Sequence, residues 1–179
     1  MAFFDSLSEV QKKFVEKQKM FFVATAVKDG RINLSPKGLD SLKVLNDSTI
    51  AWLNLTGSGN ETAAHIKEQN RMTLMLCSFE GNPLILRIYG KARAIHQQDQ
   101  DWQEFYSHFP ESAGARQIFE MKIESVQTSC GFAVPNMNFV SERSMLNEWT
   151  DKKSPEEIKD YWEKKNSQSI DGKPTGIFD

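Results

Sequence analysis

The 179-residue chain contains few of the residues that form covalent cross-links or metal sites. Its two cysteines, Cys77 and Cys130, show neither a CxxC pair nor a cysteine–histidine spacing, so we expect no disulfide framework and no metal centre. The three histidines, His65, His96 and His108, share no ligand spacing either, and we interpret them as surface or capping residues.

Long apolar runs and a charge imbalance are also absent. No stretch reaches the roughly 18 apolar residues that a membrane helix requires, and the segment after Met1 lacks the basic and apolar regions of a signal peptide. The formal net charge is only −2, whereas nucleic-acid binders and polybasic membrane anchors carry an excess of cations. We therefore expect a cytoplasmic protein with no nucleic-acid partner and no membrane partner.

The common catalytic and nucleotide-binding motifs are missing as well. The sequence has no GxGxxG motif and no Walker loop, no GxSxG nucleophile elbow and no HExxH pair. No side chain is therefore singled out as catalytic. Apolar residues make up 39% of the chain and charged residues 26%, which is ordinary for a soluble globular domain.

What the sequence does contain is a series of short strand patterns separated by turn signals. Asp29-Gly30 and Asn46-Asp47 mark two hairpin turns, and Pro36 favours an edge strand or a strand end. This regular spacing predicts a mainly β fold, a β-barrel with α-helical additions. The expected strands are 20–27, 31–35, 42–45, 48–53, 71–79, 84–95 and 118–126.

The expected helices lie at both ends of the chain and between the strands. Ser58 and Glu61 have the spacing of a capping box, which predicts Ser58 as the N-cap of a helix over 61–69. Ser154-Pro155-Glu156-Glu157 is a strong helix start. We assign residues 1–140 to the barrel and 141–179 to a helical extension and tail of the same domain. The tail over 166–179 is expected to be loose or to lie on a partner, and the remaining helices are 6–18, 96–108 and 143–150.

Three polar clusters are candidate ligand sites. In the first, Arg31, Asn33 and Ser35 share one strand face and Lys37 follows, a set that can hold a phosphate or form a solvent-facing hairpin. In the second, Trp52 precedes a Gly/Ser/Thr loop that opens a helix, where free N–H groups favour anions; the alternative is an ordinary capped loop. The third places Arg87, Tyr89, Lys91 and Arg93 on one strand face, which is either a lining for an anionic ligand or an exposed sheet surface.

These clusters, in this order, resemble the pyridoxamine 5′-phosphate oxidase-like family of flavin mononucleotide (FMN)-binding split barrels. The similarity is fairly specific for the family but not for a substrate. It is carried by Phe21-Phe22-Val23-Ala24-Thr25-Ala26, Gly30-Arg31-Ile32-Asn33-Leu34-Ser35-Pro36-Lys37-Gly38, Trp52-Leu53-Asn54, Gly57-Ser58-Gly59-Asn60-Glu61-Thr62 and Leu86-Arg87-Ile88-Tyr89-Gly90-Lys91-Ala92-Arg93.

The resemblance implies a six-stranded antiparallel Greek-key barrel and a homodimer with FMN at the subunit interface. It places cofactor contacts on three segments, the strand after the first hairpin, the fourth strand with its following loop, and the cation-bearing strand. The implied cofactor-binding residues are Arg31, Asn33, Leu34, Ser35, Lys37, Trp52, Leu53, Thr56, Gly57, Ser58, Asn60, Thr62 and Arg87.

The sequence differs from the oxidase itself in two places. Ser58-Gly59-Asn60 stands where the oxidase has an Arg-Lys pair, and its C-terminal Arg and His motif is not evident. Lys37 and Arg31 are therefore left to supply charge, and vitamin B6 oxidation is not expected. The leading hypothesis is an FMN-dependent oxidoreductase that acts on a small molecule or NAD(P)H. The alternatives are a non-catalytic or stress-related flavin-binding protein, or a split barrel for deazaflavin or haem with His65 as axial ligand.

Overall fold

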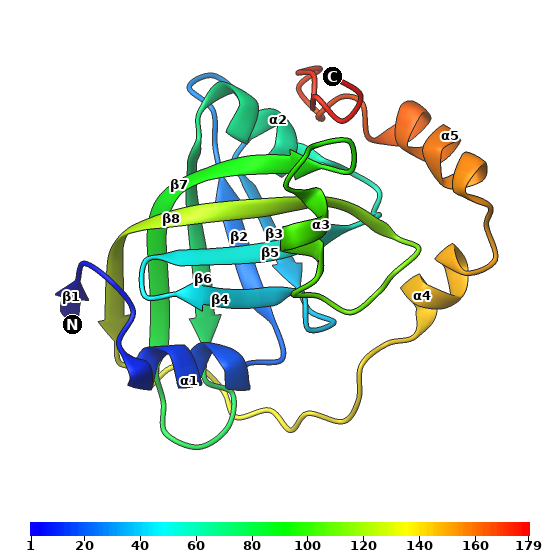
Figure 1. Ribbon diagram of the computed structural model, residues 1–179. Helices are drawn as coiled ribbons and strands as arrows, with labels where there is room; N and C mark the ends of the chain where they lie inside the picture. Colours follow the sequence, from blue (N-terminus) through cyan, green and yellow to red (C-terminus); the bar gives the residue numbers. More distant parts are fainter.

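The computed structural model describes residues 1–179 and shows one antiparallel sheet that curls into a barrel with helices around it (Figure 1). The predicted fold class is therefore confirmed. The sheet order is β3-β2-β6-β7-β8-β5-β4, and β1 pairs with the far end of β8. The strands are β1 (Ala2–Phe4), β2 (Phe21–Thr25), β3 (Asn33–Lys37), β4 (Leu42–Asn46), β5 (Thr49–Leu55), β6 (Arg71–Cys77), β7 (Ile85–His96) and β8 (Ala115–Ser129).

The sheet has eight strands rather than the six that the resemblance implies. The additional β1 is only three residues long, too short for the alternation on which a strand prediction depends. Strands β3 and β4 form the two free edges, so the barrel is split between them. Pro36 lies within β3, where the open side of an edge strand tolerates the missing N–H.

Strand alternation places the core inside the curled sheet. In β2, Phe21, Val23 and Thr25 are buried while their neighbours are only half-buried, as the period of two residues in a strand requires. The largest buried side chains of the interior include Trp52 and Phe119, whose rings stack with centroids 4.7 Å apart. A smaller apolar cluster lies on the outer side of β5, beneath α3 (Trp102–Tyr106).

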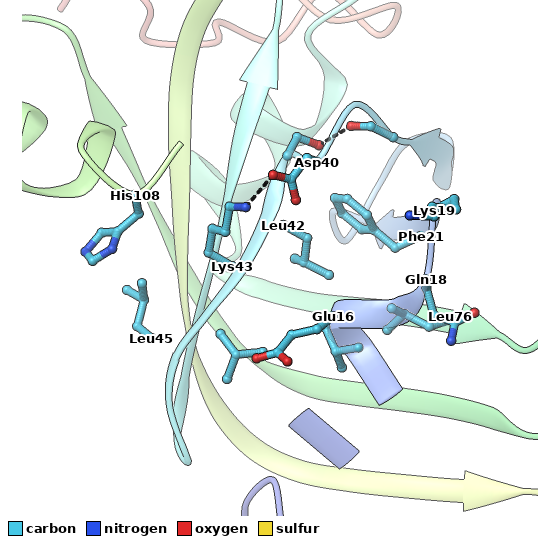
Figure 2. A pocket seen from close by; sticks show the side chains of 14 residues that line it. Glu16, Gln18, Lys19, Phe21, Asp40, Leu42, Lys43, Leu45, Leu76 and His108 are labelled. Atoms are coloured by element: carbon cyan, nitrogen blue, oxygen red, sulfur yellow. Dashed lines mark hydrogen bonds and ion pairs between the residues drawn. The ribbon is translucent and has the colours of Figure 1, made fainter. Parts of the chain in front are cut away.

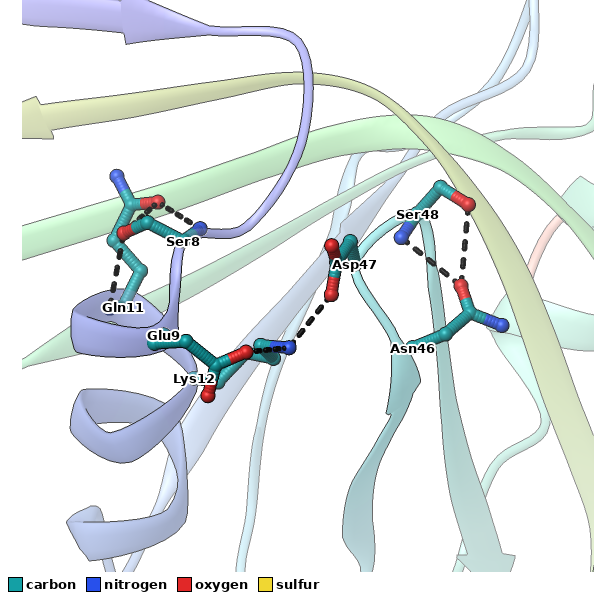
Figure 3. Close-up of polar contacts among 7 residues, drawn as sticks. All are labelled: Ser8, Glu9, Gln11, Lys12, Asn46, Asp47 and Ser48. Carbon is teal, nitrogen blue, oxygen red and sulfur yellow. Dashed lines mark hydrogen bonds and ion pairs between the residues drawn. The ribbon is translucent and has the colours of Figure 1, made fainter.

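Helix α1 (Glu9–Lys17) packs beside the β4–β5 turn through polar contacts at its N-terminus (Figure 3). Ser8 and Gln11 form a capping box, and Lys12 contacts both Glu9 and Asp47. The backbone N–H of Leu7 donates to the Asp47 carbonyl at 2.8 Å. These contacts satisfy the free donors of the helix start and hold α1 against β4.

Two local predictions are wrong. Helix α2 (Glu61–Glu68) begins after Asn60 and not after Ser58, because the Glu61 carboxylate accepts the backbone N–H of Ile170 and does not turn back to close a capping box. The predicted helix over 96–108 shrinks to α3. The Asp99 side chain accepts the backbone N–H of His96 at 2.8 Å, which stabilises a turn at the start of that segment.

The C-terminal segment packs on its own chain. Helices α4 (Met145–Thr150) and α5 (Pro155–Lys165) follow a long stretch without regular structure. Ser154 is the N-cap of α5, as predicted, and also forms a capping box with Glu157. The tail after α5 returns to α2, as Figure 1 shows, and buries Thr175 and Ile177. The tail is therefore not loose, as one of the two expectations had it, but packed on its own domain. None of the helices is long and apolar enough to span a membrane.

Gly90 is the position in β7 where no side chain fits. A Cβ at this position would lie 2.1 Å from the backbone oxygen of Lys122 in β8, beside a register shift between the two strands. We expect Gly90→Ala to lower the free energy of unfolding by about 1–3 kcal/mol, because the paired strands must separate. Urea unfolding followed by tryptophan fluorescence measures the change. Gly57→Ala is the control, since its nearest neighbour is 4.0 Å away; equal losses in both variants would contradict the prediction.

Candidate functional site

The inner face of β3 carries three of the predicted site residues. Asn33, Ser35 and Lys37 are half-buried and alternate with the exposed Leu34 and Pro36. The inner set pairs with the buried residues of β2, so it faces the barrel interior beside the split. The predicted shared face is therefore present, but Lys37 belongs to it and Arg31 precedes the strand.

Asn33 connects β3 to α2. Its Nδ2 donates to Oγ1 of Thr62 at 3.2 Å and to Oγ1 of Thr25 at 3.4 Å. Oγ1 of Thr25 lies 3.0 Å from Nδ1 of His65, whose Nε2 is buried without a partner. Two predicted residues, Asn33 and Thr62, thus meet in one polar cluster. His65 is enclosed in this cluster with 1% of its surface exposed, which disfavours it as an axial ligand to haem.

Lys37 lies over the Trp52 ring, with Nζ 5.2 Å from the ring centroid. It forms no ion pair with a carboxylate. Burial, and to a smaller extent the nearby positive charge of Arg116, together lower the pKa of Lys37 from 10.5 to about 8. An aromatic face stabilises a cation only modestly, so Lys37 is a cation that lacks a counter-ion.

Arg116 is a second cation near Lys37 and is fully buried, which the sequence reasoning missed. Its side chain is enclosed, Nη1 donates to the Gly59 carbonyl at 3.1 Å, and Nε has no partner. Burial lowers the pKa of Arg116 to about 9. Arg116 falls at a register shift opposite Leu55, where β8 has one residue more than β5. The one signal in the sequence that points to Arg116 is its position at the start of β8, a strand with alternating apolar residues.

Lys37 and Arg116 together define what this part of the barrel can do chemically. A buried charge is costly unless an opposite charge or hydrogen-bond acceptor accompanies it. Arg116, like Lys37, forms no ion pair, and its Nε–H lacks an acceptor. The pair, called the cation pair below, is therefore suited to an anion that reaches the split of the barrel.

The loop between β5 and α2 is held by C-terminal residues. Oγ1 of Thr56 donates to the Gly114 carbonyl at 2.9 Å and accepts Nε1 of Trp162 at 2.9 Å. The Gly57 carbonyl accepts Nδ2 of Asn166 at 3.0 Å. Nδ2 of Asn60 donates back to the Asn166 carbonyl at 3.3 Å. Of the predicted loop residues, Ser58 is exposed, whereas Thr56, Asn60 and Thr62 are buried.

The two predicted arginines lie away from the cation pair. Arg31 pairs with Asp171 of the tail. Arg87 is on the outward face of β7. It pairs with Met75 of β6, which in turn pairs with Phe22 of β2. Nη1 of Arg87 donates to Oγ of Ser129 at 3.2 Å. The structure therefore does not bring Arg31, Arg87 and Lys37 together within one chain.

Trp52 and Leu53 are core residues of β5. The Trp52 ring is fully buried against Phe119 and Phe21, so it is not the open aromatic surface that we expected. Leu53 is buried on the opposite side, and its N–H donates to the Ser41 carbonyl at 2.8 Å. Nε1 of Trp52 has no hydrogen-bond partner.

A cavity of about 440 Å³ lies between α1 and β4 (Figure 2). Phe21, Leu42 and Leu76 contribute to its apolar lining, and Lys43 is paired with Asp40 at 2.6 Å on its rim. None of the predicted cofactor-binding residues lines it. This volume lies within the range of small-molecule pockets, and Gly38, the residue after Lys37, is part of the lining.

Known proteins of the same kind match most of the chain. The family model for pyridoxamine 5′-phosphate oxidase matches residues 7–130. A curated relative from Aspergillus flavus, the pyridoxamine 5′-phosphate oxidase family protein ustO, is 34% identical over 190 aligned positions, which cover 96% of this chain and 76% of the relative.

Two solved structures share the fold. A candidate pyridoxamine 5′-phosphate oxidase of Lactobacillus delbrueckii aligns with a TM-score of 0.56 and 22% identity, over 69% of this chain and 95% of that protein. HupZ of Group A Streptococcus aligns with a TM-score of 0.54 and 16% identity, over 74% of this chain and 99% of HupZ. At these identities the two structures support the fold alone, whereas the family match and the curated relative show that this chain belongs to the pyridoxamine 5′-phosphate oxidase family.

Proposed function

We propose that the protein binds FMN at the split of the barrel and serves as a flavin-dependent oxidoreductase. The observation that carries the proposal is the cation pair, because Lys37 and Arg116 are positive charges that the chain itself leaves without a carboxylate. A flavin that ends in a phosphate supplies the missing negative charge. The chain belongs to the pyridoxamine 5′-phosphate oxidase family, and its resemblance to the FMN-binding split barrels of that family supports the same ligand.

The residues around the split fit such a cofactor. Lys37 and Arg116 would hold the phosphate, and the unpartnered Nε–H of Arg116 is a free donor for one of its oxygens. The half-buried inner face of β3, with Ser35 between Asn33 and Lys37, offers hydroxyl and amide groups beside it. The half-buried Gly57 and the exposed Ser58 complete the set from the neighbouring loop.

The chemistry would come from the flavin, which accepts and donates electrons when it is bound. The chain contributes binding, orientation and positive charge, and the structure adds no side chain that acts as acid, base or nucleophile at the split. A small-molecule substrate or NAD(P)H is the expected electron partner. A flavin spectrum in the purified protein, together with NAD(P)H oxidation, separates an oxidoreductase from a passive flavin binder, and a Soret band would indicate haem instead.

We also propose a homodimer through the outward face of the sheet. Leu34 is 64% exposed, and the strand register places it in one outward row with Ala24, Thr73 and Tyr89. The next outward row runs from Pro36 across the sheet to Phe3 of β1, which is 63% exposed. This face combines exposed and half-buried apolar side chains with Arg87 and Gln127, and such a mixture of aromatic residues, methionine and arginine is typical of a protein–protein interface.

The dimer proposal is tested by a charge on this face. We expect Leu34→Lys to convert a dimer into a monomer, because two lysines would be brought together and desolvated at the twofold contact. Light scattering coupled to size-exclusion chromatography measures the mass. Val10→Lys is the matched control, since Val10 is 78% exposed on α1, away from this face. A wild-type monomer, or an unchanged mass for Leu34→Lys, would contradict the proposal.

Substitution of Lys37 tests whether this residue contacts the phosphate of FMN or has a general role in the site. We expect Lys37→Ala to weaken FMN by about ten- to a hundredfold and riboflavin, which has no phosphate, by much less, since a hydrogen bond to a charged group contributes about 1.5–3 kcal/mol. Flavin fluorescence quenching gives both dissociation constants. Lys19→Ala serves as the control on a lysine near the α1 cavity. Equal losses for the two flavins would place Lys37 away from the phosphate.

The lowered pKa of Lys37 predicts how FMN affinity depends on pH. Lys37 is charged below its pKa of about 8 and neutral above it, and only the charged form attracts a phosphate. FMN affinity should therefore be constant near neutral pH and fall by about tenfold between about pH 7 and about pH 9. Riboflavin affinity should stay level over this range, and FMN affinity of Lys37→Ala should fall by no more than about twofold, because Arg116, whose pKa is about 9, is still at least half charged at pH 9. A parallel fall in all three would show that another group titrates.

A further inference from the structure

The C-terminal tail occupies the region in which the sequence analysis placed a phosphate. The Asp171 carboxylate accepts the backbone N–H of Arg31 at 2.7 Å and also pairs with its guanidinium. The backbone N–H of Ile170 donates to both oxygens of Glu61 at 3.0 and 3.1 Å, at the first residue of α2. Two carboxylates thus stand where the resemblance implies a dianion.

The tail is firmly attached, and its contacts extend along the whole of α2. Lys173 pairs with Glu68 at 2.5 Å, and Lys67 pairs with Asp179. Oγ1 of Thr175 donates to the Asn166 carbonyl at 2.7 Å, and both residues are buried. The tail is therefore part of the folded domain, and Asp171 is held in place by contacts on either side of it.

The charges at the two ends of β3 are consequently different. Hydrogen bonds from the Arg31 backbone, and then its side chain, hold the pKa of Asp171 below its usual range, so Asp171 is an anion at neutral pH. Arg31 already has its counter-ion, whereas Lys37 and Arg116 have none. A phosphate beside Arg31 would meet Asp171 and Glu61, and a phosphate beside the cation pair would meet no carboxylate.

We propose that Asp171 is a specificity-determining residue, a built-in anion that occupies Arg31 and thereby directs the phosphate of a bound ligand to Lys37 and Arg116. This inference rests on the proposed flavin site, since it states which cations of that site remain available. Arg31 holds the tail, and the cation pair holds the ligand. The sequence alone allows a phosphate beside Arg31 or beside Lys37, and the tail leaves only the position beside Lys37 available.

The test compares the preference for FMN over riboflavin among variants of the full chain. We expect Arg31→Gln to leave this preference within about twofold of wild type, Asp171→Asn to raise it by about two- to fivefold because Arg31 becomes free, and the double variant to return to the wild-type value. Arg31→Gln loosens the tail as Asp171→Asn does, so it controls for tail detachment. Arg71→Gln, at an exposed arginine of β6, controls for net charge.

A second measurement does not depend on flavin. Inorganic phosphate is titrated while the arginine Nε–H signals are followed by NMR. In wild type the signal of Arg116 should move and that of Arg31 should not; in Asp171→Asn both should move. A shift of Arg31 in wild type, or a loss of FMN preference in Arg31→Gln, would overturn the inference. A wild-type protein that binds phosphate at Arg116 but no flavin would refute the proposed function alone.

Discussion

The pairing of β7 with β8 is the constraint on which the rest of the structure depends. These are the longest strands, and they are in register along the whole of β7 except for one shift at Gly90. Because Gly90 has no Cβ, the β8 backbone comes close enough for both strands to bend together and curl the sheet. Every other strand is placed relative to this ribbon, as Figure 1 shows.

The same ribbon decides where positive charge is buried. At its start, β8 has one residue more than β5, and that irregularity places Arg116 next to the β5–α2 loop. The free edge β3 brings Lys37 over Trp52 on the opposite side of the split. Removing either cation from water without a carboxylate partner costs free energy. Lys37 and Arg116 therefore leave the barrel with positive charge that no carboxylate of the chain neutralises, and the proposed phosphate would neutralise it.

The C-terminal extension distributes the remaining charges. Trp162 of α5 donates to Thr56, which anchors the extension on the loop after β5. From there the tail places Asp171 on Arg31 and Ile170 on Glu61. The extension is thus the reason why two segments with similar polar sequences, around Arg31 and around Lys37, have different roles. One is neutralised within the chain, and the other is left open.

Local signals determined much of the fold in advance. Strand-forming residues predicted β2 and alternation predicted β8. The Asp29-Gly30 and Asn46-Asp47 turns predicted two hairpins, and Ser154-Pro155 predicted the start of α5. These features depend on residues within a few positions of one another, and the ordered motifs were enough to indicate the family. Ser58 failed as a helix cap because Glu61 binds a residue 109 positions away.

The tertiary structure alone decided the chemistry of the candidate site. Arg31 and its partner Asp171 are separated by 140 positions, and Arg116 and Gly59 by 57. No periodicity or motif in one segment specifies such a contact, because it arises from how the curled sheet and the returning tail pack. The sequence therefore determined which elements form and which family they build, and the packing determined that Lys37 and Arg116, rather than Lys37 and Arg31, are the cations left without a counter-ion.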